Sequence, residues 1–130
     1  MTQHREIVTA LGAPAALGPY SHAVKAGGLL FCSGQVALDP QTMTLVGDTA
    51  AEQAHRCLEN LAAVCAAAGA ALGDAVRCTV WLRDMAAFRE VNEVYASFFA
   101  GEPPARVAIA VAGLPADALV EIDAIVALAD

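Results

Sequence analysis

The chain has 130 residues, enough for one domain with its own hydrophobic core. Its net charge of −7 and only seven dispersed Lys and Arg residues argue against an electrostatic grip on nucleic acid. Hydrophobic residues make up 58%, but the longest uncharged helical stretch, residues 61–73, is too short to span a bilayer, and the N-terminus lacks the apolar core of a secretory signal. We therefore expect one domain over residues 1–130 of a cytoplasmic protein that inserts into no membrane.

The first part of the chain is predicted to form strands. Residues 6–9 favour a short strand, and residues 20–25 and 29–38 favour a hairpin. Its turn falls at Gly27 and Gly28, a dipeptide that tolerates the positive φ of a tight turn.

Capping signals mark two helices. Thr49 and Glu52 fit a capping box, and apolar residues then follow at three-four spacing up to Gly69, a plausible C-cap. Asp84 can cap a second helix over residues 85–100. The intervening strand should have one fully apolar face, made of Val76, Cys78, Val80 and Leu82.

The stretch over residues 104–129 carries the most chemistry. Arg106 shares a strand face with small residues such as Ala108, and a guanidinium over such a floor suits a bound carboxylate. In the next strand Glu121 and Asp123 alternate with apolar residues, where a carboxylate can orient water or carry a proton. The same pattern is also typical of an ion pair at the rim of a sheet.

The cysteines and histidines show no spacing typical of a metal site or a catalytic triad. We expect free thiols buried in the core, because the cysteines fall in apolar strands or on the apolar helix stripe. We expect solvated histidines, and an Asn92 side chain that ties the second helix to a loop. The residues concerned are Cys32, Cys57, Cys65, Cys78, His4, His22 and His55.

Together these elements predict an α+β fold in the order β-β-β-α-β-α-β-β. Two helices for about six strands would cover one face of a mixed sheet and leave the other bare. Val107, Ile109 and Val111 would then form part of an exposed apolar patch, which a monomer rarely tolerates. We therefore expect oligomerisation through the sheet face.

Several short motifs occur in a fixed order along the chain. Each is weak alone, but their order and spacing together make the chain resemble the RidA (YjgF) family of enamine and imine deaminases over nearly its whole length. Residues 118–122 also resemble the branch that acts on aminoacrylate in pyrimidine breakdown. The motifs are Gly18-Pro19-Tyr20, Ser33-Gly34-Gln35, Asn92-x-x-Tyr95-x-x-Phe98-Phe99, Pro104-Ala105-Arg106, and Leu114-Pro115 followed by Val120-Glu121-Ile122.

This resemblance implies a chorismate-mutase-like fold and a homotrimer with its sheets around a central barrel and three clefts between subunits. It implies hydrolysis of 2-aminoacrylate or 2-imino acids to the 2-oxo acid and ammonia, with no metal or organic cofactor. Arg106 would hold the substrate carboxylate, and Glu121 would orient or activate water at the imine carbon. Tyr20 and Ser33 would line the cleft.

One position departs from the family pattern. Many members carry a cysteine two residues after this arginine, where this chain has Ala108. An iminium carbon is already electrophilic, so positioned water suffices without a covalent intermediate. A backbone group at Ala108 can still contact substrate. The departure leaves the subfamily and the particular imino acid open.

Alternatives remain for both the residues and the function. Tyr20 can equally pack beside Pro19, and Ser33 can simply satisfy a backbone group. The chain is also compatible with an endoribonuclease or translation inhibitor of the L-PSP type, although its acidity and its lack of a histidine pair weigh against that. A non-enzymatic module that binds small carboxylates would need only Arg106, whereas turnover also needs placed water.

Overall fold

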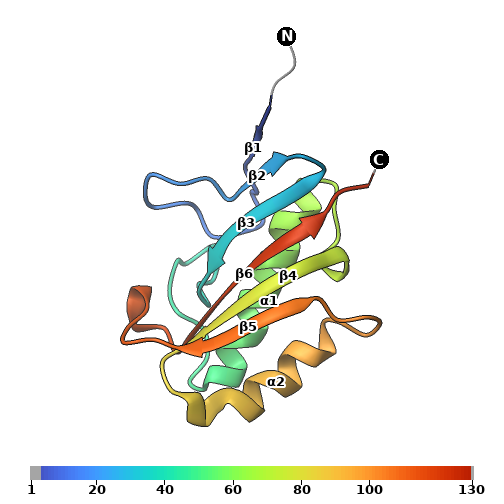
Figure 1. The fold of residues 1–130 in the computed structure, drawn as a ribbon. Helices are drawn as coiled ribbons and strands as arrows, with labels where there is room; N and C mark the ends of the chain where they lie inside the picture. The colour runs from blue at the N-terminus through green and yellow to red at the C-terminus, as the bar shows by residue number, and fades with distance from the viewer. Residues whose placement is uncertain (1–3, 130) are drawn as a thin grey trace.

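The computed structural model describes residues 4–129, and it confirms the predicted α+β fold and order of elements. Six strands form one mixed sheet in the order β1-β2-β3-β6-β4-β5, and both helices lie on one side of it (Figure 1). Within these residues β4 and β5 run parallel and the other pairs antiparallel. The elements are β1 (Glu6–Val8), β2 (Ala23–Ala26), β3 (Leu29–Gln35), α1 (Ala50–Ala67), β4 (Ala75–Leu82), α2 (Phe88–Ser97), β5 (Ala105–Ala110) and β6 (Val120–Ala127).

The predicted hairpin forms at the predicted turn. Gly27 and Gly28 have φ of 59° and 78°, the left-handed region that glycine enters without steric cost. β3 then pairs with β6 through an irregularity: Cys32 stands opposite Ala124, but Gln35 stands opposite Ile122. Two residues of β3 therefore face a single residue of β6, which is a β-bulge.

Helix α1 anchors the core against the sheet. The predicted capping box is present, since the Thr49 hydroxyl accepts from the backbone N–H of Glu52 and the Glu52 carboxylate reaches back. Its stripe, which includes Leu58 and Leu61, is fully buried against the sheet face that carries Ile122. Burying one such aliphatic side chain contributes roughly 1.5–3 kcal/mol. This packing fixes which side chains of β6 point inward.

Two predicted elements differ from the structure in detail. The second helix begins with a separate 3₁₀ turn, Met85–Ala87, in which Asp84 accepts from the N–H of Ala86, so α2 is shorter than predicted. The apolar face of β4 is interrupted at Val76, which is 44% exposed. Its pairing with β6 slips by one residue there, which breaks the period of two.

The sheet face opposite the helices is open, as predicted, and it combines apolar side chains with the polar Arg77, Thr79 and Asp123. Phe31 is 42% exposed and Ile109 is 40% exposed, and both belong to this face. Trp81 lies between Ile109 and Glu121 in the cross-strand register. Val111 was predicted to extend the patch, but it lies beyond the end of β5.

Among residues 4–129, no helix combines the length and the apolar character that crossing a membrane requires.

Candidate active site

Three predicted site residues meet in one hollow, which we call the Glu121 cleft. Tyr20, Ser33 and Glu121 line it, and its volume is about 550 Å³. Glu121 is the one side chain of this lining that is charged at neutral pH, and the rest of the wall is mostly apolar. The other lining residues are Leu17, Gly18, Gly34, Val36, Leu38, Pro115 and Ala116.

The Glu121 carboxylate is half-buried and carries no partner within residues 4–129. Neither the hydrogen bonds nor the ion pairs of this part of the chain include it. Burial raises the pKa of Glu121, and the nearby charge of Asp123 raises it further. Asp123 itself accepts from the backbone N–H of Thr79 at 2.9 Å, so its carboxylate makes a structural bond between β6 and β4. The cleft therefore presents a carboxylate that takes up a proton more readily than an exposed one.

Ser33 and Tyr20 occupy the cleft in different ways. The Ser33 hydroxyl donates to the carbonyl of Ser21 at 2.6 Å, so it satisfies a backbone group while its oxygen still lines the cleft. Tyr20 is 51% exposed at the rim, and its ring lies beside Gly18. For Ser33, both alternatives considered from the sequence are therefore realised together.

Arg106 lies in a second hollow, which we call the Arg106 cleft and which shares no lining residue with the first. Its volume is about 590 Å³. The wall comes from α2 and from the segment between α2 and β5. The lining residues are Asn92, Tyr95, Ala96, Phe99, Gly101, Pro103, Pro104 and Arg106.

The Arg106 guanidinium is held by α2 and by no carboxylate of the described chain. Its Nη1 donates to the Asn92 side-chain oxygen at 2.7 Å. Its central carbon lies 5.0 Å from the ring centroid of Tyr95 and 5.4 Å from that of Phe88, within the range of cation–π attraction. The alternative of a rim ion pair is therefore not found among residues 4–129, and Arg106 lies against aromatic rings as well as beside small residues.

Asn92 was expected to bind a loop, and this prediction is wrong. The helix places Asn92 between Phe88 and Tyr95 on one face, because side chains three and four residues apart are neighbours. The helical periodicity of the sequence predicts that Phe88, Asn92 and Tyr95 share a face. It does not predict that Arg106 of the edge strand β5 contacts this face, because that contact depends on how α2 packs against the sheet.

Arg106 and Glu121 project from opposite faces of the sheet. Across the strands, Cys78 pairs with Arg106, whereas Trp81 pairs with both Ile109 and Glu121. Cys78 and Trp81 are three residues apart in β4, so they and their partners point to opposite sides. Within one chain, therefore, the Glu121 carboxylate does not face the arginine, a separation that sequence alternation alone does not reveal because it does not fix the register between strands.

Ala108 shares the face of Arg106. It pairs with Val80 and packs, half-buried, against the core under the helices. Its side chain lines neither the Glu121 cleft nor the Arg106 cleft.

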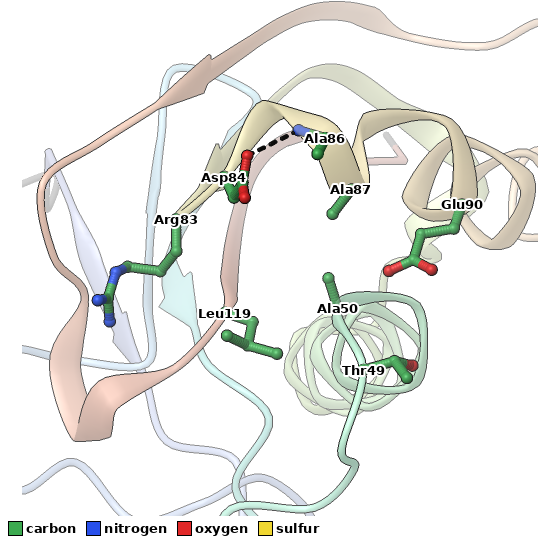
Figure 2. A pocket seen from close by; sticks show the side chains of 8 residues that line it. All are labelled: Thr49, Ala50, Arg83, Asp84, Ala86, Ala87, Glu90 and Leu119. Atoms are coloured by element: carbon green, nitrogen blue, oxygen red, sulfur yellow. Dashed lines mark hydrogen bonds between the residues drawn. The ribbon is translucent and has the colours of Figure 1, made fainter.

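A third hollow contains none of the predicted site residues. It has a volume of about 370 Å³ and lies between the start of α1 and the segment from β4 to α2. Figure 2 shows Asp84 turned back to cap Ala86, and Arg83 and Glu90 at opposite ends of the hollow. The start of α1, which faces this space, is already capped by Thr49 and Glu52.

The thiols are as predicted, but one histidine is not. All four cysteines are free and buried, and burial strongly raises the pKa of Cys57. His22, expected in solvent, is only 5% exposed. Its Nδ1 accepts from the N–H of Ala10 and its Nε2 donates to the carbonyl of Pro14, which ties down the loop before β2. Within residues 4–129, no group of His, Cys, Asp or Glu is arranged to hold a metal ion.

Comparison with known proteins agrees with this architecture. The sequence profile of a family described as endoribonuclease L-PSP matches residues 10–128. The RutC family protein PH0854 of Pyrococcus horikoshii is 46% identical over 93% of this chain and 96% of its own length. The 2-iminobutanoate/2-iminopropanoate deaminase of Mus musculus is 45% identical, with 93% and 90% covered. The crystal structure of E. coli TdcF with bound serine has a TM-score of 0.90 at 38% identity, with 95% and 99% covered.

The chain therefore belongs to the RidA (YjgF) family, which includes enzymes named for the deamination of reactive imines.

Proposed function

We propose that this protein hydrolyses 2-imino acids and 2-aminoacrylate to the corresponding 2-oxo acid and ammonia. The observation that carries the proposal is the state of Arg106. A guanidinium has five N–H donors, and within residues 4–129 Arg106 uses one of them, on Asn92. The remaining donors can bind a planar carboxylate in two parallel hydrogen bonds. A relative of 45% identity is named for deaminating imino acids, each of which carries such a group.

The site that we propose is shared between two subunits. Arg106 and Glu121 belong to separate clefts on opposite faces of the sheet, so one chain does not bring them to the same small substrate. An assembly in which the Arg106 cleft of one subunit abuts the Glu121 cleft of the next would do so. The apolar side chains exposed on the open sheet face support such an assembly, because a lone monomer rarely exposes a surface of this kind. We propose a homotrimer with three such sites.

Glu121 would supply the proton transfer. The reacting form is the protonated imine, which 2-aminoacrylate also forms when its terminal carbon takes up a proton. Arg106 fixes the substrate carboxylate, and the Glu121 carboxylate takes a proton from a water molecule as the water oxygen bonds to the iminium carbon and the C=N electron pair moves to nitrogen. The proton passes from Glu121 to the amine nitrogen of the resulting carbinolamine. The carbon–nitrogen bond then breaks, ammonia leaves, and loss of the hydroxyl proton forms the 2-oxo acid.

This scheme needs no nucleophilic side chain at position 108. The carbon under attack is electron-poor before the enzyme acts, so Ala108 is compatible with turnover. Tyr20 and Ser33 would line the substrate space. The apolar wall that includes Val36 and Leu38 would face the side chain of the imino acid.

The family description names an endoribonuclease, but the acidic chain and the Glu121 cleft offer little for that activity. The chain has a net charge of −7, and the Glu121 cleft contains no cation to bind phosphate. The cytoplasmic location inferred from the sequence stays a prediction.

The decisive experiment is to generate imines in situ from a panel of amino acids with an amino acid oxidase, and to follow 2-oxo acid release. The protein should accelerate release, and Arg106→Ala should abolish the acceleration. Tight binding of 2-oxo acids without acceleration would instead show a binding module.

A further inference from the structure

The carboxylate of Glu121 lies against β3 at the bulge between β3 and β6. Ser33 and Gly34 are the two residues of β3 that stand opposite the single residue Asp123 of β6. A bulge of this kind bends the strand and changes the direction of nearby side chains, and bulges are frequent beside active sites. Here the Glu121 side chain extends from β6 over the backbone of Gly34.

Gly34 provides the space that this carboxylate occupies. A Cβ atom built on Gly34 would lie 3.0 Å from the Glu121 Cδ and 3.2 Å from its Cγ, and would collide with Oε2. The three atoms nearest to that hypothetical atom all belong to Glu121. The backbone of Gly34 is outside the left-handed region, so its φ does not require glycine. Glycine is required here because the Glu121 side chain occupies the space that a Cβ atom would need.

A methyl group at this position would move the carboxylate in one direction. Gly34 and Glu121 line the same hollow, so a carboxylate displaced from Gly34 has the open interior of the Glu121 cleft to move into. It would there be better solvated and farther from the strand that holds Ser33. A displacement of about 1 Å at a reacting group can reduce turnover by about 10²-fold.

We propose that Gly34 is a positioning residue that holds the Glu121 carboxylate at the wall of the cleft, and that it acts on the reaction solely through Glu121. This inference rests on the proposed imine hydrolysis for its effect on turnover. Its effect on Glu121 itself is independent of any activity.

The test compares Gly34→Ala with a matched control, Gly73→Ala, in the full-length assembled protein. Gly73 also has φ outside the left-handed region and has no atom within 4 Å of its hypothetical Cβ, and it lines neither cleft. Three readouts are needed: imine turnover against pH, binding of a 2-oxo acid by calorimetry, and titration of the Glu121 carboxyl carbon by ¹³C NMR. The Glu121→Gln spectrum assigns the resonance.

In Gly34→Ala we expect turnover to fall about 10²-fold, with the acid limb of the pH profile moved to lower pH. The titration of Glu121 should move the same way, because burial raises its pKa in the parent. Binding of the 2-oxo acid should stay within about twofold, because Arg106 is untouched, and Gly73→Ala should match the parent throughout.

Parental turnover and a parental Glu121 titration in Gly34→Ala would overturn the role of Gly34. A parent protein without turnover would refute the proposed function alone, since the ¹³C titration still decides whether Gly34 positions the carboxylate. If Gly34→Ala does not fold, Glu121→Asp withdraws the carboxylate from β3 without adding an atom. It should lose turnover to a similar degree, and parental turnover in that variant would also overturn the inference.

Discussion

Replacing Arg106 by lysine keeps the positive charge of the Arg106 cleft but removes the planar guanidinium. The structure shows what this planarity provides: one hydrogen bond to Asn92 at 2.7 Å and contact with the rings of Phe88 and Tyr95. Together these contacts orient the remaining donors. A lysine ammonium is a compact charge on a flexible stem, and it cannot donate two parallel bonds to one carboxylate.

The expected loss is that of one of the two parallel hydrogen bonds to the substrate carboxylate. One hydrogen bond to a charged group contributes roughly 1.5–3 kcal/mol. This corresponds to a fall in kcat/KM of about 10- to 150-fold. Arg106→Lys should therefore perform nearly as badly as Arg106→Ala.

The assay is 2-oxo acid release from imines generated in situ, with Arg89→Lys as the matched control. Arg89 is an exposed arginine of α2 that lines neither cleft, so this control should keep the parental rate. An Arg106→Lys variant that also keeps the parental rate would refute the reasoning, because charge without the guanidinium fork would then suffice.

Three further outcomes follow from the two clefts. Because the pKa of Glu121 is raised in the folded state, its ionisation destabilises the fold as pH rises through and above the ordinary glutamate range. Glu121→Gln should therefore raise the urea midpoint at pH 7 but not at pH 4, and an equal effect at both would contradict this. Among residues 4–129 the buried Tyr95 hydroxyl has only the weakly accepting Cys78 thiol beside it, so Tyr95→Phe should change the free energy of unfolding by no more than about 1 kcal/mol at fixed protein concentration. A larger loss measured by urea denaturation would contradict this. The walls of the Glu121 cleft are mostly apolar and contain no cation. The imine of leucine should therefore react faster than the imine of glutamate in the same oxidase assay. The reverse order would show that the substrate side chain lies outside this cleft.

Local patterns in the sequence predict most of the elements. The capping residues at Thr49 and Glu52, the turn at Gly27 and Gly28, and the alternation of β6 each depend on neighbours close in sequence, and the structure confirms all three. Tertiary packing decides the rest. Val76 is exposed because of a slip in strand pairing that a period of two does not reveal.

The candidate site was predictable as a set of residues but not as an arrangement. Arg106, Glu121, Tyr20 and Ser33 follow from chemistry and from family motifs, and each lines a cleft. That Arg106 and Glu121 face opposite ways depends on the register of three strands. The role of Gly34 could not be predicted, because it depends on the bulge in β3. A glycine in a strand can simply weaken that strand, or it can make room for another group close to the backbone, and the sequence does not distinguish the two.

The central claim is that Arg106 of one subunit and Glu121 of another act on the same substrate. Complementation tests it most directly. Arg106→Ala and Glu121→Gln, each inactive alone, are unfolded together, mixed in equal amounts and refolded, and imine hydrolysis is measured at matched concentration. If the site is shared, an interface between the two variants can combine the intact Arg106 of one with the intact Glu121 of the other, and that site then contains both functional residues. Random assembly into a closed ring should then restore roughly a quarter of the parental activity. Mixed assemblies, verified by native mass spectrometry, that stay as inactive as the separate variants would contradict the account.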